Sequence, residues 1–143
     1  MRALRLAIVV MLVLGLGSAS IAAEEEFKVI VHPDISVDAV SRDFLRDAYL
    51  KKATEWSSGT TVHPIDLSTK FGVRSAFIEK VLRKTPTQLR RYWNQQIFSG
   101  KGVPPPEASS TDAVISYVLS HKGAVGYLPA SADSGKAKVI KVQ

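Results

Sequence analysis

The sequence predicts an α/β domain in which a mixed, mainly parallel sheet carries helices on both faces. Two observations predict this class. Segments rich in β-branched residues alternate with segments whose apolar residues recur at helical spacing. Their order along the chain is β-α-β-α-α-α-β-β, and strands that are separated by helices favour parallel pairing between two helical layers.

The first 22 residues have the pattern of a secretory signal peptide. Arg2 and Arg5 precede an apolar run over 6–16, and small residues follow, with Ser20 and Ala22 at the positions that a signal peptidase prefers. We therefore expect cleavage after Ala22, a periplasmic or secreted protein, and no stable membrane anchor after cleavage. The alternative is an uncleaved anchor, but the run of 11 apolar residues is shorter than the ~20 residues that span a bilayer.

Cleavage would leave one domain of 121 residues, 23–143. Since Arg2 and Arg5 belong to the leader, 17 of the 19 basic residues remain against 13 acidic residues, a net charge of +4. The sequence contains no Cys, so an exported domain would depend on a packed core rather than on disulfides. The small positive excess does not predict nucleic-acid binding by itself and is compatible with a modest preference for anions.

The first half of the domain predicts two strands and a helix. A strand is expected over 27–32, where β-branched residues predominate. The helix that follows is capped by Ser41 and should end near Lys52. The second strand is expected over 60–67, and Pro64 favours an edge position or a strand end there.

Two helices follow the second strand. Residues 68–72 form a loop, and an apolar stripe over 73–82 predicts the first of these helices. Thr85 and Pro86 predict the start of the second helix, with Thr85 as its N-cap and Pro86 at its first position. The inner face of this second helix consists of apolar and aromatic residues, namely Leu89, Tyr92, Trp93 and Ile97.

The last part of the chain predicts one helix and two strands. Residues 100–110 contain three consecutive prolines and two glycines and should form a loop. A helix opens at Thr111 and is terminated by Gly123. Strands are expected over 124–128 and 136–142.

Metal, nucleophile and cofactor chemistry have no support in the sequence. His32, His63 and His121 are far apart along the chain, and no Cys accompanies them. No Gly-x-Ser-x-Gly elbow and no glycine-rich phosphate loop is present. We therefore predict a protein that is not an enzyme and that has no catalytic residue, no metal and no cofactor.

One junction does suggest ligand chemistry. The loop after the second strand enters a helix, and a helix N-terminus offers backbone N–H groups and a positive dipole to an anion. Side-chain hydroxyls and cations of the same loop add to it. The candidate anion-binding residues are Ser68, Thr69, Lys70, Gly72 and Arg74. The alternative is that Ser68 or Thr69 merely caps the helix and that the two cations are ordinary surface residues.

A basic set around residue 85 raises a nucleic-acid alternative. Tyr92 and Trp93 are interleaved with cations, as in many nucleic-acid surfaces. Both aromatic residues fall on the apolar stripe with Leu89, however, which favours core packing. We therefore predict no nucleic-acid partner. The cations concerned are Lys80, Arg83, Lys84, Arg90 and Arg91.

Several short segments follow one another in a characteristic order over about residues 28–128. They are Val31–Asp34, the Ser41-led helix ending at Tyr49–Leu50, Trp56–Thr60, Val62–Pro64, Tyr92–Trp93, Phe98–Gly102 with Pro104–Pro106, and Lys122–Tyr127. Together these segments resemble one family, the phosphate-type substrate-binding proteins of ABC transporters. This resemblance implies a type-2 periplasmic-binding-protein-like fold, of which this chain would be a single lobe, whereas full-length members hold the ligand between two lobes.

The resemblance also implies a weakened ligand site. Where phosphate-binding members have Ser-Gly-Thr-Arg at the helix start, this chain has Phe71, Gly72, Val73 and Arg74. Phe and Val supply no side-chain hydrogen bond, and each lost bond to a charged ligand costs about 1–3 kcal/mol. Two hypotheses follow: weak binding of a small anion such as phosphate, or loss of ligand binding in favour of a periplasmic protein-interaction or accessory role. Pairing of two copies as a homodimer stays open.

Overall fold

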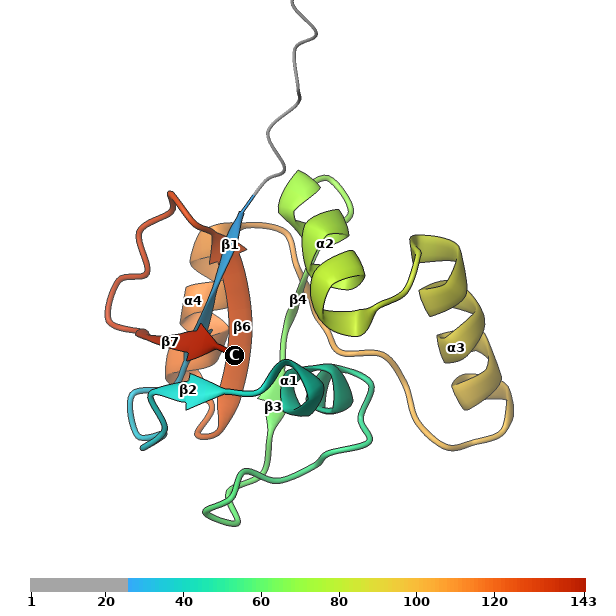
Figure 1. Ribbon diagram of the computed structural model, residues 1–143, viewed down its shortest axis with the longest axis horizontal. Helices are drawn as coiled ribbons and strands as arrows, with labels where there is room; N and C mark the ends of the chain where they lie inside the picture. Colours follow the sequence, from blue (N-terminus) through green and yellow to red (C-terminus); the bar gives the residue numbers. More distant parts are fainter. Residues whose placement is uncertain (1–25) are drawn as a thin grey trace, which may run out of the picture.

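The computed structural model describes residues 26–143, so the expected signal peptide lies outside the described residues. The elements follow one another along the chain as shown in Figure 1. They are β1 (Phe27–Val31), β2 (Ala39–Val40), α1 (Arg42–Tyr49), β3 (His63–Pro64), β4 (Asp66–Leu67), α2 (Gly72–Phe77), the π-helical turn η1 (Ile78–Leu82), α3 (Pro86–Phe98), β5 (Glu107–Ala108), α4 (Thr111–Ser120), β6 (Ala124–Pro129) and β7 (Lys138–Val142).

The main sheet has the strand order β2-β7-β1-β6-β3. The outer pairings β2–β7 and β6–β3 are parallel, whereas β1 is antiparallel to both of its neighbours, β6 and β7. The mixed sheet is therefore confirmed, but the expected excess of parallel pairing is not. The reason is that β6 and β7 do not pair with each other: β1 lies between them and runs in the opposite direction.

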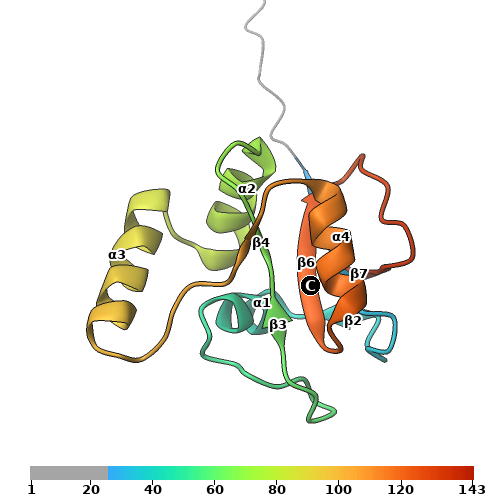
Figure 2. The ribbon, with the colours of Figure 1, turned by 180° about the vertical axis from the view of Figure 1, so that it is seen from behind.

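Strand β6 shows why helices cover both faces of this sheet. Side chains alternate between the faces of a strand, and neighbours on β6 meet different helices. A Cβ at Gly126 would meet Val114 and Val118 of α4, whereas the ring of Tyr127 stacks on Phe77 of α2 at 3.9 Å. Figure 2 shows α4 in front of the sheet when the molecule is seen from behind, opposite α1 and α2.

An aromatic cluster fills the layer between the sheet and α1 and α2. Phe77 packs against Tyr49 at 4.7 Å and against Phe27 at 5.3 Å between ring centroids, both edge to face. The hydroxyl of Tyr49 donates hydrogen bonds to the carbonyl oxygens of Ile65 and Val125. The core therefore joins α1 and α2 to β6 by ring contacts and by hydrogen bonds of a buried phenol.

The expected strand over 60–67 is two short strands instead of one. β3 pairs with β6, and β4 pairs in parallel with β5 in a separate two-stranded sheet. Pro64 has no N–H to donate, so the ladder cannot continue unbroken through it. The prediction of a loop over 100–110 is wrong near its end, because Glu107 and Ala108 form β5, the partner strand of β4. The prediction also missed β2.

Three helices begin where the sequence predicted them to begin. Ser41 caps α1, and Thr85 caps α3 in a reciprocal capping box with Gln88. Helix α4 begins at Thr111, as expected, and its N-cap is Ser110. Helix α1 ends at Tyr49, short of Lys52.

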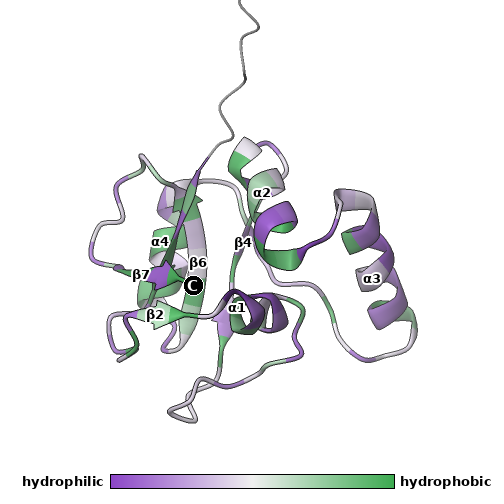
Figure 3. Cartoon of the chain, viewed as in Figure 1, coloured by the Kyte–Doolittle hydropathy of each residue, from purple (hydrophilic) through white to green (hydrophobic). Residues whose placement is uncertain are grey.

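Helix α3 stands apart from the sheet (Figure 1). It is connected to the rest of the chain by the turn around Arg83, which has a positive φ of 54°, and by the proline-rich segment that leads to β5. Figure 3 shows that α3 is largely hydrophilic, whereas the hydrophobic residues gather on the sheet and its covering helices. Among the described residues, every helix is too short or too polar to cross a membrane.

Gly126 is predicted to be intolerant of a side chain. An added methyl group would lie 2.7 Å from Val114 and 2.9 Å from Ile65, and these β-branched side chains have little rotamer freedom. We expect Gly126→Ala to lower the free energy of unfolding by about 1–3 kcal/mol, measured by denaturant unfolding. The control is Ser116→Ala on the exposed face of α4, which should leave stability within about 0.5 kcal/mol. Equal stability of the two variants would contradict this packing.

Candidate functional site

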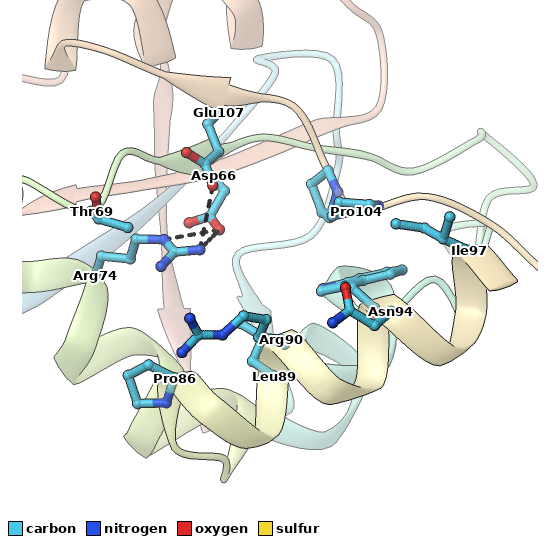
Figure 4. Close-up of a pocket in the computed structure, with 12 residues that line it drawn as sticks. Asp66, Thr69, Arg74, Pro86, Leu89, Arg90, Asn94, Ile97, Pro104 and Glu107 are labelled. Atoms are coloured by element: carbon cyan, nitrogen blue, oxygen red, sulfur yellow. Dashed lines mark hydrogen bonds and ion pairs between the residues drawn. The ribbon is translucent and has the colours of Figure 1, made fainter.

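A cavity of about 360 Å³ opens between the start of α2, the helix α3 and the segment that leads into β5. Figure 4 shows its lining: Asp66 and Glu107 lie on one wall beside Arg74, and residues of α3 form the opposite wall. One wall of the cavity is therefore the helix that stands apart from the sheet.

Asp66 is the centre of a polar network at one end of the cavity. Its Oδ1 accepts hydrogen bonds from the N–H of Leu67 at 2.8 Å and from the hydroxyl of Tyr127. Its Oδ2 accepts from Nε and Nη2 of Arg74 at 3.2 and 3.1 Å. Only 13% of the Asp66 side chain is exposed, so both carboxylate oxygens are satisfied by the protein rather than by solvent.

Arg74 neutralises two carboxylates. Asp66 and Glu107 are register partners on the parallel strands β4 and β5, and like charges in that position repel each other. The guanidinium of Arg74 lies 3.1 Å from Oδ2 of Asp66 and 3.5 Å from Oε1 of Glu107. Burial of Arg74 lowers its pKa, but the charge and hydrogen bonds of Asp66 outweigh this and leave the pKa raised. Arg74 is therefore a charged, structurally committed residue.

Two buried phenols support this network. Burial raises the pKa of Tyr127, and the negative charge of Asp66 raises it further. Burial likewise raises the pKa of Tyr49, and the nearby Tyr127 and Asp66 add to the effect. Both hydroxyls therefore stay protonated and act as hydrogen-bond donors, Tyr127 to Asp66 and Tyr49 to backbone carbonyl groups.

Arg90 is the other cation of the cavity. It projects from α3, and Figure 4 shows its guanidinium pointing toward Arg74 across the opening. Within residues 26–143, no hydrogen bond or ion pair involves this guanidinium. Arg74 is paired with Asp66 and Glu107, whereas the N–H donors of the Arg90 guanidinium are unpaired among the described residues.

The structure brings only two of the five sequence-predicted residues to the cavity. Thr69 and Arg74 line it. Lys70 is exposed and lies over the ring of Phe71 at 5.5 Å. Gly72 is the exposed first residue of α2. Ser68 does not line the cavity, and its buried Oγ has no hydrogen-bond partner in the described part of the chain.

The start of α2 differs from a simple anion cradle. Phe71 is the N-cap and has no side-chain hydrogen bond, so neither Ser68 nor Thr69 caps the helix. The N–H of Phe71 donates to the carbonyl of Ser68, and the N–H of Arg74 donates to the carbonyl of Phe71. The backbone N–H of Arg74 is therefore already hydrogen-bonded within the turn, whereas the sequence predicted that the N–H groups of this helix start would be free to bind an anion.

The two apolar residues at the helix start do not form a mouth of the site. Val73 is fully buried, and Phe71 is half-buried and packed against the core. The start of α2 therefore presents no open apolar surface made by these two residues. The helix start is turned so that these side chains stabilise the lobe itself.

The sequence reasoning missed Asp66, Arg90 and Glu107 as site residues. The spacing of Pro86, Arg90, Asn94 and Ile97 places them on one stripe of a helix, and all four line the cavity. That stripe was a signal for Arg90. For Glu107 no signal existed, because its approach to Arg74 depends on the pairing of two-residue strands.

The aromatic residues of α3 are engaged in the fold. Trp93 is only 8% exposed, and the hydroxyl of Tyr92 donates to the carbonyl of Leu50. These rings therefore do not form an open stacking surface for bases.

The rings of His63 and His121 lie 5.9 Å apart, but the described residues contain no group of three or more potential metal ligands.

No protein-family model matches the sequence, and no curated protein sequence matches it. Solved structures do match. A protein from Clostridium perfringens, described as a phosphate ABC transporter substrate-binding protein with bound phosphate, has a TM-score of 0.64 at 19% identity. An ABC-type phosphate transport receptor from Vibrio cholerae has 0.65 at 16%, and PstS from Borrelia burgdorferi has 0.62 at 14%.

These matches establish the fold. They cover 82%, 82% and 83% of this chain but only 45%, 46% and 47% of the three matched chains. The chain thus spans about half the length of the structures it resembles. Its fold is α/β and corresponds to a single lobe of the type-2 periplasmic-binding-protein-like fold, as the sequence predicted.

The Asp66 network is predicted to contribute measurably to stability. We expect Asp66→Asn to lower the free energy of unfolding by about 1.5–3 kcal/mol, because Tyr127 and Arg74 lose an anionic acceptor. Denaturant unfolding followed by tryptophan fluorescence measures this change. The control is Asp38→Asn: Asp38 pairs with Lys138 at 2.9 Å but is 91% exposed, so the midpoint should not change. An unchanged midpoint for Asp66→Asn would contradict the role assigned to the network.

Proposed function

We propose that this chain is an exported, non-enzymatic, solute-binding-protein-like domain that binds a small anion weakly. The proposed site is the cavity between α2, α3 and β5 rather than the backbone of the 68–74 loop. Export rests on the signal-peptide pattern of residues 1–22, with residues 23–143 as one domain. The small-anion ligand accords with the phosphate-binding proteins that share the fold.

One observation carries the ligand part of this proposal. The guanidinium of Arg90 faces the cavity without a partner among the described residues, and a guanidinium is suited to hydrogen-bond an oxyanion. Thr69 adds a hydroxyl to the same lining. Arg74 fixes the wall and contributes less to binding because it already serves Asp66 and Glu107.

The charges of the cavity explain why binding would be weak. Two arginines, Arg74 and Arg90, face two carboxylates, Asp66 and Glu107. The charged lining is therefore neutral overall. An anion is attracted by Arg90 but repelled by the half-exposed Glu107, so salt should weaken the interaction readily.

Arg90→Gln tests this site directly. We expect inorganic phosphate to bind about tenfold more weakly to this variant, because one charge-assisted hydrogen-bonding group is lost. Isothermal titration calorimetry of the purified protein at low salt measures the affinity.

The matched control for this test is Arg91→Gln. Arg91 is the exposed neighbour on α3 and does not line the cavity. Equal weakening by both variants would indicate a general charge effect, and no weakening by Arg90→Gln would remove the site.

The alternative function is a protein-interaction or accessory module. It is favoured by an apolar tip at the end of α3, which we define as Ile97, Phe98 and Val103. Their side chains are 52%, 97% and 58% exposed, respectively. Large apolar side chains that are exposed within one short stretch of chain, here residues 97–103, are a candidate contact surface. Self-association of two copies is the form of this function that the protein alone can display.

Phe98→Ser tests the apolar tip. If the tip mediates self-association, the wild type should show a concentration-dependent increase in sedimentation coefficient, and Phe98→Ser should abolish it. Sedimentation velocity measures both. The control is Val139→Ser, since Val139 is 49% exposed but lies on β7. A wild type that stays monomeric at all concentrations would contradict self-association through the tip.

A further inference from the structure

The cavity beside Arg90 is larger and less polar than an inorganic oxyanion requires. Its volume is about 360 Å³, and six of its twelve lining residues are apolar. These are Pro86, Leu89, Trp93, Ile97, Pro104 and Pro105. Clefts of this size with mainly apolar walls and a few placed polar groups are typical of sites for small organic molecules.

Polar and apolar residues are separated within the cavity. The charged residues Asp66, Arg74 and Glu107 lie together on one wall, joined by the ion pairs of Arg74. Figure 4 shows Ile97 and Pro104 on the side away from Arg74, near Asn94, whereas Pro86 lies close to Arg90. Arg90 lies between the two regions. A ligand that fills the cavity therefore meets a cation at one place and hydrocarbon over much of the remaining wall.

The charge pattern also limits the ligand. Arg74 is paired with two carboxylates, so Arg90 is the one cation of the cavity that has no anionic partner among the described residues. A single anionic group beside Arg90 satisfies it. Additional charges on the ligand would lie near Glu107 or against apolar walls, and both positions are unfavourable.

The apolar wall is already ordered without a ligand. Pro104 and Pro105 have restricted backbone angles, and Leu89 and Trp93 are buried to 5% and 8% exposure. An apolar group that enters this region loses water contact without having to order the wall first. Preorganised walls of this kind convert buried ligand area into affinity efficiently.

We propose that the cavity takes a small organic anion, with its anionic group beside Arg90 and its hydrocarbon or aromatic body against Leu89, Ile97 and the two prolines. This inference rests on the proposed anion site and specifies its ligand class. Removal of a methylene group from water favours binding by roughly fourfold. An organic anion should therefore bind more tightly than inorganic phosphate.

Three probes test the ligand class: inorganic phosphate, methylphosphonate and phenylphosphonate, titrated calorimetrically at one pH and one ionic strength. The expected order of affinity is phenylphosphonate, then methylphosphonate, then phosphate, with about a tenfold difference between the extremes. Phosphate that binds as tightly as phenylphosphonate would overturn the inference while leaving the proposed function intact. Failure of all three probes to bind would overturn both.

A variant separates the apolar wall from the cation. Ile97→Ser should reduce the ratio of phenylphosphonate to phosphate affinity about threefold or more, since a half-exposed side chain can be replaced without disturbing the core. Arg90→Gln should weaken both ligands. Val139→Ser, on the remote strand β7, should leave the ratio unchanged. An unchanged ratio in Ile97→Ser would overturn the inference.

Discussion

The carboxylate of Asp66 connects the core of the lobe to its candidate site, and the geometry of the cavity depends on it. It accepts from the buried hydroxyl of Tyr127 on β6, from the N–H of Leu67, and from the guanidinium of Arg74 on α2. A carboxylate that is only 13% exposed would be costly without these donors. With them, it fixes how the start of α2 sits against the end of β4.

The same interaction explains why the site has little net charge. Parallel pairing of β4 with β5 brings Glu107 beside Asp66, and Arg74 neutralises both. The arginine that the sequence assigned to a ligand is thereby used to hold two strands and a helix together. Arg90, which α3 supplies from the opposite wall of the cavity, has no such carboxylate partner among the described residues.

Helix α3 has a well-capped N-terminus and lies at the periphery of the lobe. Its capping box with Pro86 at the first turn stabilises the helix locally, and Leu89 and Trp93 supply its buried side chains. One stripe of the helix forms the cavity wall, and its end exposes the apolar tip.

The sequence by itself determined the fold class, most helix caps and the long strands, because these depend on periodicity and on local hydrogen bonds. Ser41, Thr85 and the β-branched run of β1 act within a few residues of themselves. The direction of β1 between β6 and β7, the two-residue strands β4 and β5, and the neutralisation of Arg74 depend on contacts between distant segments. Thr69 and Arg74 line the cavity and belong to the loop that the sequence singled out. The positions of Asp66, Arg90 and Glu107 at the same cavity depend on tertiary packing, which decides which charges become neighbours.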